Sequence, residues 1–399
     1  MNVFKKAYYR LYQGAFYLML PLLPYRQPKI LHTDNEVVEV LNQKGINKVL
    51  LVTDKGIRGL GLTASLEKKI QESGKTLAVY DQTVPNPTTQ NVKEALEVYN
   101  QNNCEGLVAF GGGSVMDCAK AVGAKVARPN KSLKQMKGVL KVGRKIPTLI
   151  AVPTTAGTGS ETTLAAVITD SETRHKYAIN DFPLIPSFAL LKPELTQNLP
   201  KHITSTTGMD ALTHAIEAYI GRSTTRQTRA HALAASKAIF ENLVSVYNNG
   251  QDLDKRAKLL QAAYDAGVAF TKSYVGYVHA IAHTLGGKYD LPHGLANAII
   301  LPYVLKAFGK SVHKKLWKMG VHAGLFAKEV SKQDGAKLFI EKIEEMNKAM
   351  GIPTKIAQIK EKDIPTLAKI AEKEANPLYP VPKLFDAKQL EEIYHQIKE

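Results

Sequence analysis

The chain has 399 residues, of which 44% are hydrophobic and 22% charged, a composition that excludes a disordered or fibrous protein and leaves room for two globular domains. Its two cysteines, Cys104 and Cys118, are too few for a disulfide framework, so we expect a cytoplasmic protein. The formal net charge is +17, and residues 125–145 include eight basic residues and no acidic one. No interleaved aromatic side chains accompany this patch, so a solvated basic surface is favoured over a nucleic-acid partner.

Residues 1–30 are predicted to form an amphipathic N-terminal extension. Aromatic side chains recur every four positions, at Phe4, Tyr8, Tyr12 and Phe16, with basic residues between them. The apolar run that follows is interrupted by prolines and, at about ten residues, is far shorter than the roughly 20 that span a bilayer. We expect the aromatic stripe to pack on the domain or on a second subunit of a homodimer, and contact with a membrane surface is the alternative.

Residues 31–200 are predicted to form an α/β domain with a mainly parallel, Rossmann-like sheet. Short apolar runs alternate here with segments of helical periodicity. The predicted strands are residues 48–53, 77–80, 106–110, 149–152 and 188–191, and the predicted helices include residues 63–73 and 89–99. Such alternation indicates helices on both faces of a parallel sheet, whose ligands bind outside the carboxyl ends of the strands.

A glycine-rich turn follows the predicted strand GLVAF. It comprises Gly111, Gly112, Gly113 and Ser114, and a helix with Asp117 in its early part begins at once. Glycines let a backbone approach a ligand closely, and the amides at a helix start favour a pyrophosphate. The turn is not the G-x-G-x-x-G fingerprint. By itself it predicts a dinucleotide site no more strongly than a plain tight turn.

Two other strand ends in this domain carry polar residues. The carboxylate of Asp54 could accept hydrogen bonds from ribose hydroxyls and repel a 2′-phosphate, or it could cap the next helix. The segment PTTAGTGSE, residues 153–161, offers hydroxyl donors and close backbone approach to a cofactor. A polar loop without a ligand is an equally good interpretation of that segment.

Residues 201–399 are predicted to form an all-helical domain that binds a metal ion. Strand patterns nearly vanish, and apolar residues recur at helical spacing over residues 230–247, 257–270 and 336–350. Asp210 and His214 stand four apart, as do His279 and His283, so each pair lies on one helix face. His293 follows a proline and precedes a glycine, where the chain turns. One carboxylate and three imidazoles can converge on a divalent ion with one position left open.

The HAIAH segment is superficially similar to the H-E-x-x-H helix of zinc metalloproteases. That chemistry needs a glutamate as general base, and Ala280 occupies its position. The segment therefore argues against a zinc protease.

Together these motifs resemble those of the iron-containing (group III) alcohol dehydrogenase family. The family's metal site has the form D-x-x-x-H, H-x-x-x-H and P-H-G, preceded in the chain by GGGSxxDxAK. The resemblance covers residue 30 to the C-terminus and implies the architecture shared with dehydroquinate synthase. It implies that the metal ligands are Asp210, His214, His279 and His293, with Fe²⁺ as the first choice and Zn²⁺ as the alternative.

The same resemblance implies a cofactor site for NAD. It assigns to the cofactor cleft the glycine-rich turn, Asp117, Asn86, Thr154, Thr155, Thr158 and Lys176. Because the segment VTDKG also matches the family, Asp54 favours NAD over NADP. Lys192 departs from the family, which commonly has Asp there, and Ala165 stands where some relatives have a polar group. The second departure leaves a diol and a simple alcohol both open as substrates.

We therefore expect an NAD- and metal-dependent dehydrogenase that interconverts a small primary alcohol and its aldehyde. His283 is expected to pass a proton or orient substrate, although a packing role is nearly as well supported. A polyol dehydrogenase acting on glycerol or a propanediol is the main alternative. A lyase of the dehydroquinate synthase type would need several basic residues beside the metal, and these are lacking. A basic membrane- or nucleic-acid-binding protein with a vestigial enzyme fold is the alternative from another class, and the intact ligand set argues against it.

Overall fold

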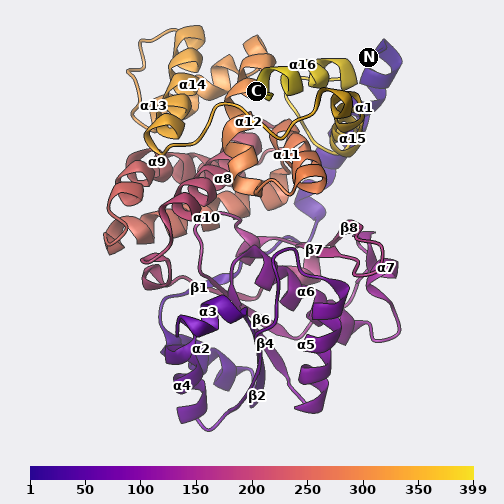
Figure 1. Cartoon of the computed structure of the whole chain (residues 1–399), viewed down its shortest axis with the longest axis vertical. Coiled ribbons are helices and arrows are strands. Elements are labelled where there is room, and N and C mark those ends of the chain that lie inside the picture. The colour runs from indigo at the N-terminus through magenta and orange to yellow at the C-terminus, as the bar shows by residue number, and fades with distance from the viewer. The chain divides into compact units, whose positions relative to one another are not determined.

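The computed structural model describes all 399 residues and divides into two compact units (Figure 1). The α/β unit comprises residues 24–198, and the helical unit comprises residues 1–23 and 199–399. The N-terminal segment therefore groups with the helical unit rather than standing apart as an extension. No single helix is long and apolar enough to cross a bilayer, although the pair His293–Ser311 and His313–His322, bent by 118°, passes the test of length and composition together.

The α/β unit contains a six-stranded sheet in the order β1-β9-β6-β4-β2-β3. Its strands are parallel, as the sequence predicted, and β1 is a strand that the sequence analysis did not predict. Its strands are β1 (Lys29–Leu31), β2 (Lys48–Val52), β3 (Thr76–Tyr80), β4 (Gly106–Gly111), β6 (Thr148–Pro153) and β9 (Phe188–Leu190). The central strands β2, β4 and β6 are apolar and buried along almost their whole length, which is typical of a parallel sheet covered on both faces. Its helices are α2 (Asp34–Gln43), α3 (Lys55–Gly59), α4 (Ala64–Glu72), α5 (Thr89–Gln101), α6 (Gly113–Ala127) and α7 (Leu133–Met136).

A second, three-stranded sheet was not predicted from the sequence. It has the order β5-β8-β7, with β5 (Gly138–Val139), β7 (Ala165–Thr169) and β8 (Lys176–Asn180). Strands β7 and β8 are antiparallel, and only alternate residues of each are buried. Their mixed small and polar composition hides the alternation that would indicate a strand.

The helical unit is built on α8 (Lys201–Ile220), a helix whose residues are almost all buried from Gly208 onward. A helix that is buried all round must be surrounded by other helices. The remaining helices are α1 (Val3–Met19), α9 (Arg226–Asn248), α10 (Leu253–Ser273), α11 (Tyr277–Tyr289), α12 (His293–Phe308), α13 (His313–His322), α14 (Lys332–Ala349), α15 (Ile364–Ala375) and α16 (Ala387–Ile397). The predicted helices at residues 230–247, 257–270 and 336–350 correspond to α9, α10 and α14.

The N-terminal helix α1 forms as predicted, and of the predicted aromatic stripe only Phe16 packs on the helical unit, against Tyr274 at 5.1 Å, while packing of the stripe on a second subunit stays a prediction. The buried side chains are Tyr9, Gln13 and, just after the helix, Leu20, while Phe4, Tyr8 and Tyr12 of the predicted stripe are exposed. Gln13 explains the choice of face, since its Nε2 donates to the carbonyl oxygens of Tyr379 at 2.8 Å and Pro377 at 3.2 Å. A polar side chain thus anchors the helix, and apolar side chains face solvent.

Candidate metal centre and cofactor loop

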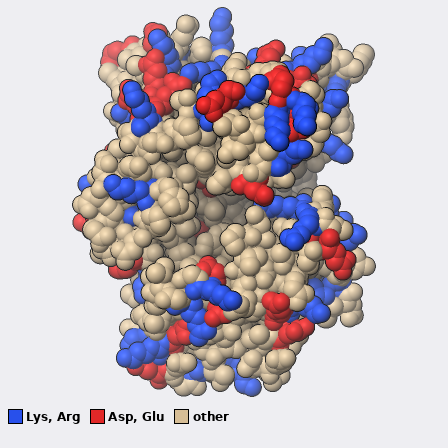
Figure 2. All heavy atoms as spheres, in the orientation of Figure 1, with Lys and Arg blue, Asp and Glu red and all other residues tan.

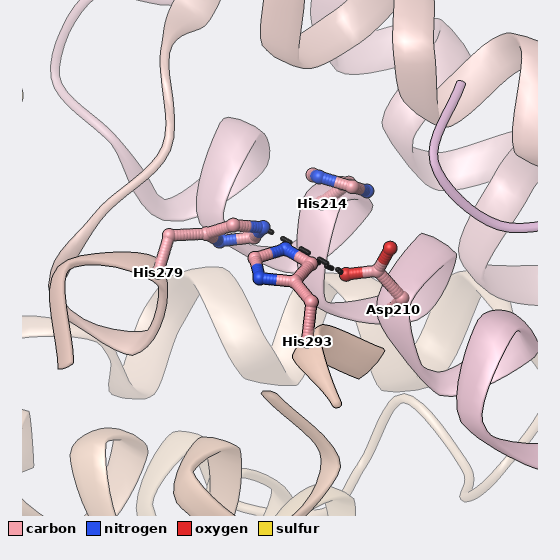
Figure 3. Close-up of side chains that lie close together, drawn as sticks. All are labelled: Asp210, His214, His279 and His293. Atoms are coloured by element: carbon pink, nitrogen blue, oxygen red, sulfur yellow. Dashed lines mark ion pairs between the residues drawn. The ribbon is translucent and has the colours of Figure 1, made fainter. Parts of the chain in front are cut away.

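Four side chains from three helices of the helical unit form a compact cluster (Figure 3). Asp210 and His214 come from α8, His279 from the first turn of α11 and His293 from the first residue of α12. One ligand atom from each lies within 4.8 Å of the others. The structure thus brings together the four predicted ligands. Their role as ligands stays a prediction, because the distances show only that a shared ion would fit.

Local sequence explains why three helices can meet here. Asp210 and His214 lie one turn apart on α8 and so point the same way. Pro292 precedes α12, and Gly294 lies in its first turn. A Cβ atom on Gly294 would stand 2.4 Å from the carbonyl oxygen of Thr206 in α8, so only glycine lets these two helices approach this closely.

Glu217 orients one of the proposed ligands. Its Oε2 lies 2.6 Å from Nδ1 of His279, and its two oxygens also accept the backbone N–H groups of Gly276 and Val278. A proton on Nδ1 leaves Nε2 of His279 free to bind a cation. Burial lowers the pKa of His279 well below its ordinary value, so the ring is neutral, as a metal ligand must be.

The contacts of Asn297 show that acceptor atoms of the cluster converge on one point. Its Nδ2 lies 2.7 Å from Oδ1 of Asp210, 3.0 Å from Nε2 of His293 and 3.2 Å from Nε2 of His279. The acceptor atoms of three proposed ligands thus converge on one positively polarised group, while the amide Oδ1 is buried without a hydrogen bond. Convergent acceptors of the N₃O type suit Fe²⁺ or Zn²⁺. The cluster therefore fits the metal that the sequence predicted.

The ring of His214 is held by stacking. It lies parallel to the ring of Phe270, with centroids 4.0 Å apart and an interplanar angle of 11°, and stacks at 4.5 Å on His279. These contacts fix the ring orientation that sequence spacing could not define.

His283 lies beside the cluster and is not among its four members. Its ring stacks on His293 with centroids 5.3 Å apart, and its side chain is 44% exposed. Nδ1 of His283 lies 2.6 Å from Oε1 of Glu374, which also accepts the hydroxyl of Tyr379 at 2.9 Å. Burial alone would raise the pKa of Glu374, but the charge of His283 and these hydrogen bonds lower it. His283 is thus an oriented histidine with access to solvent.

In the α/β unit, three of the predicted cofactor residues meet at the start of α6. Nζ of Lys176 donates to Oδ1 of Asn86 at 2.7 Å, and the backbone N–H of Asn86 donates to Oγ of Ser114 at 3.3 Å. Asn86 has φ 56°, a left-handed conformation that a non-glycine residue seldom adopts. Strain of this kind is typical of functional loops, although contact with a cofactor stays a prediction.

The three glycines of the turn differ in what their missing side chains permit. A Cβ on Gly111 would lie 2.6 Å from Cγ2 of Val115, whereas one on Gly112 would meet nothing closer than Thr155 at 3.8 Å. A Cβ on Gly113 would lie 3.2 Å from Cγ2 of Thr158. Gly111 is therefore required for packing, while Gly112 leaves space beside the hydroxyl of Thr155. Thr154 is buried, and its N–H donates to the Gly111 carbonyl at 3.3 Å.

Lys120 joins α6 to the threonine-rich loop. It is fully buried, and its Nζ donates to Oγ1 of Thr163 at 2.8 Å, to the carbonyl of Ala165 at 3.0 Å and to both oxygens of Ser160. Burial lowers the pKa of Lys120 to about 8 and raises that of the neighbouring Asp117 to about 6, so both are charged at pH 7. Asp117 accepts a hydrogen bond from Ser160, which points to a role in holding the loop.

Asp54 caps α3, as the alternative interpretation of the sequence expected. Its Oδ1 accepts the backbone N–H of Ile57 at 2.8 Å. The second carboxylate oxygen remains for another donor, so a cap and a ribose contact are compatible.

Comparison with known proteins agrees with this geometry. Residues 29–193 match the model of the family described as iron-containing alcohol dehydrogenase, and residues 204–398 match its C-terminal model. The chain belongs to the iron-containing alcohol dehydrogenase family. It is 40% identical to an NAD-dependent methanol dehydrogenase of Bacillus methanolicus, over 84% of this chain and 88% of the relative. It is 35% identical to a 1,3-propanediol dehydrogenase of Citrobacter freundii, over 96% of this chain and 98% of the relative.

Solved structures of iron-containing alcohol dehydrogenases and their relatives share the fold. A 1,3-propanediol oxidoreductase has a TM-score of 0.89 at 34% identity, covering 94% of this chain and 99% of that one. An alcohol dehydrogenase from Oenococcus oeni has the same TM-score at 30% identity, covering 94% of this chain and 100% of that one. The predicted fold and enzyme class, an NAD-linked oxidoreductase of the iron-containing alcohol dehydrogenase family, are therefore confirmed.

Sequence analysis missed several residues that support the sites: Glu217, Asn297 and Glu374. Two of them carried a signal. Glu217 is an acidic residue in the otherwise apolar second half of α8, and Asn297 follows His293 by one helical turn. Glu374 lies 91 residues from His283, and only the fold could reveal that pairing.

Proposed function

We propose that this protein is an NAD(H)- and iron-dependent dehydrogenase that interconverts a small primary alcohol and its aldehyde. The observation that carries the proposal is the cluster of Asp210, His214, His279 and His293 within 4.8 Å of one another. Three imidazoles and one carboxylate suit a divalent ion with an open position. A bound ion would supply Lewis acidity at the alcohol or carbonyl oxygen.

The chain's own residues would prepare the reaction in two ways. Glu217 keeps His279 in the tautomer that presents Nε2 to the ion. His283 is proposed to exchange the substrate proton at Nε2, because Glu374 holds the opposite ring nitrogen. The half-exposed ring can then return its proton to water.

The cofactor is proposed to bind the α/β unit. The start of α6 offers backbone amides to a pyrophosphate, with Gly112 leaving room and Lys176 adding positive charge. Thr154, Thr155 and Thr158 are proposed to line the same cleft, and Asp54 to select NAD against NADP. The α/β unit thus carries the cofactor and the helical unit the metal. We also propose a cytoplasmic homodimer.

Two substrate classes are supported by specific relatives. One relative is named a methanol dehydrogenase and another a 1,3-propanediol dehydrogenase, which matches 96% of this chain. A simple primary alcohol is preferred here because Ala165 adds no polar group for a second hydroxyl. A polyol such as a propanediol is the second candidate.

The proposal is tested by NADH oxidation with short aldehydes and hydroxyaldehydes, using protein reconstituted separately with Fe²⁺ and Zn²⁺. We expect turnover with Fe²⁺ and the highest kcat/KM for an unsubstituted aldehyde. Preference for 3-hydroxypropanal would select the polyol alternative. Failure to oxidise NADH with any aldehyde in either metal form would refute the proposal.

A further inference from the structure

The solvent-facing side of α1 is apolar along its whole length. Phe4, Tyr8, Leu11, Ala15 and Leu18 follow one another at intervals of four and three residues, so they lie on one face. Phe4 is 87% exposed and Leu11 and Leu18 are each 74% exposed. The exposed Val3, Tyr12 and Met19 widen the strip, and the exposed Leu22 follows just beyond the helix. A strip of this size on a monomer marks an interaction surface.

The opposite side of α1 is firmly attached to the helical unit. Arg10 donates to the carbonyl of Val381 at 2.7 Å and to that of Pro382 at 2.9 Å, and Lys5 pairs with Glu372 of α15 at 2.8 Å. The ring of Phe16 meets the ring of Tyr274 edge-on at 5.1 Å. These contacts hold the helix in place with its apolar side toward solvent, so that side does not pack on the rest of the chain.

Charge decides which partner fits this strip. Basic and acidic side chains are interspersed on the face in Figure 2, and Lys5 and Arg10 of α1 are already engaged with the helical unit, so the attraction to a partner comes from the net charge of +17 on the whole chain. A second copy of this chain would bring the same positive charge to the contact. An anionic lipid surface instead attracts a basic protein and accepts the apolar side chains of the strip.

Shape and side-chain type agree with lipid as the partner. A 17-residue helix is about 25 Å long and forms a convex ridge, which matches a flat boundary between headgroups and acyl chains. Tyr8 in the strip and Tyr12 beside it are exposed, and tyrosine hydroxyls favour the headgroup level. Residues 1–28 also lie outside the ranges that match the family models.

We propose that α1 docks the enzyme on the surface of anionic membranes by inserting Phe4, Leu11 and Leu18 between lipid headgroups. The helix lies along the surface and does not span the bilayer. The proposal is independent of the catalytic function.

Co-sedimentation with lipid vesicles tests this docking. The full chain is mixed with vesicles of phosphatidylcholine alone or with about 30 mol% phosphatidylglycerol. The wild type should bind the anionic vesicles far better than the neutral ones, and added salt should release it. Leu11→Glu/Leu18→Glu should reduce binding by about tenfold or more, with NADH oxidation unchanged.

A matched control separates the apolar strip from general charge. Leu60→Glu/Leu338→Glu adds the same two negative charges at exposed leucines elsewhere, and it should bind vesicles nearly as the wild type does. Equal loss in both double variants, or no loss in Leu11→Glu/Leu18→Glu, overturns the proposal. The proposal is also overturned if the wild type does not bind anionic vesicles. It is overturned as well if light scattering shows that Leu11→Glu/Leu18→Glu converts a dimer to a monomer, because a second copy then covers the strip in the wild type.

Discussion

Oε2 of Glu217 lies 2.6 Å from Nδ1 of His279, and both side chains are buried. The same carboxylate accepts two backbone N–H groups at the start of α11, so the residue that orients the ring also fixes the helix that carries it. The pKa of Glu217 is raised to about 7, because the effect of burial outweighs the opposing effect of these hydrogen bonds. The proposed metal site and the local fold at the start of α11 therefore depend on the same side chain.

Glu217→Gln should weaken metal binding by about 10- to 100-fold. Glutamine has one acceptor oxygen, so it cannot satisfy the three donors that glutamate satisfies. Chelator competition measures the affinity. Glu241→Gln, at an exposed position on α9, serves as the control and should bind metal normally. Unchanged affinity in Glu217→Gln would show that this contact does not act on the metal site.

Gly111 and Gly112 should respond differently to alanine. Gly111→Ala forces a Cβ to within 2.6 Å of Val115 and should lower the free energy of unfolding by about 1–3 kcal/mol. Gly112→Ala meets no atom closer than 3.8 Å and should fold normally, yet raise KM for NAD if the pyrophosphate lies against this backbone. Urea denaturation and initial rates measure the two effects. A normal KM in Gly112→Ala would remove the pyrophosphate from this turn.

Asp54→Ser separates cofactor choice from helix capping. Serine keeps the hydrogen bond to the Ile57 N–H but removes the negative charge. The ratio of kcat/KM for NADP to that for NAD should rise about tenfold, since a like-charge repulsion of roughly 1–2 kcal/mol disappears. Asp54→Asn is the companion variant and should behave in the same way. A wild type that already prefers NADP would contradict the assignment.

Lys120 should make stability depend on pH in the alkaline range. Its pKa is lowered from 10.5 to about 8 by burial, so above pH 8 the folded chain loses a proton that the unfolded chain keeps. Lys120 therefore adds to the free energy of unfolding as pH rises from about 8 to 10, by at most about 3 kcal/mol. The buried thiols of Cys104 and Cys118, whose pKa values burial raises, contribute with the opposite sign, so the effect of Lys120 is read from a comparison with a variant.

The contribution of Lys120 is measured against Lys120→Met. The variant should be less stable by roughly 3–5 kcal/mol at pH 7, because the oxygens that the lysine bonds lose their donor. It should also gain less stability than the wild type between pH 8 and 10. Lys315, whose pKa burial also lowers to about 8, contributes equally to both proteins and cancels in the difference. Urea denaturation of both proteins at several pH values measures this difference. If the free energy of unfolding changed with pH by the same amount in both, Lys120 would be excluded as the source.

The main sheet and the metal cluster could be predicted because each follows from local pattern. Apolar runs gave β2, β4 and β6 within about one residue, since a buried parallel strand needs an unbroken apolar sequence. Four-residue spacing on a helix was enough to align Asp210 with His214. The choice of His279 over His283 did not follow from spacing, because both recur on the same face, and it came from family resemblance.

The rest depends on contacts between distant segments. Glu374 reaches His283 across 91 residues, and Lys120 reaches Thr163 across 43. No local pattern encodes such pairings. The aromatic period in α1 predicted a helix correctly but not which side chains attach it to the helical unit, because hydrogen bonds of Arg10 and Gln13 to carbonyl oxygens decide the orientation.

The central claim is that His279 holds the metal and His283 does not. The most direct measurement is metal content per chain, alongside single-turnover NADH oxidation, for His279→Ala and His283→Ala. His279→Ala should lose both metal and turnover. His283→Ala should keep about one metal ion per chain and slow turnover by roughly 10²- to 10⁴-fold. Loss of metal from His283→Ala with retention by His279→Ala would contradict the account.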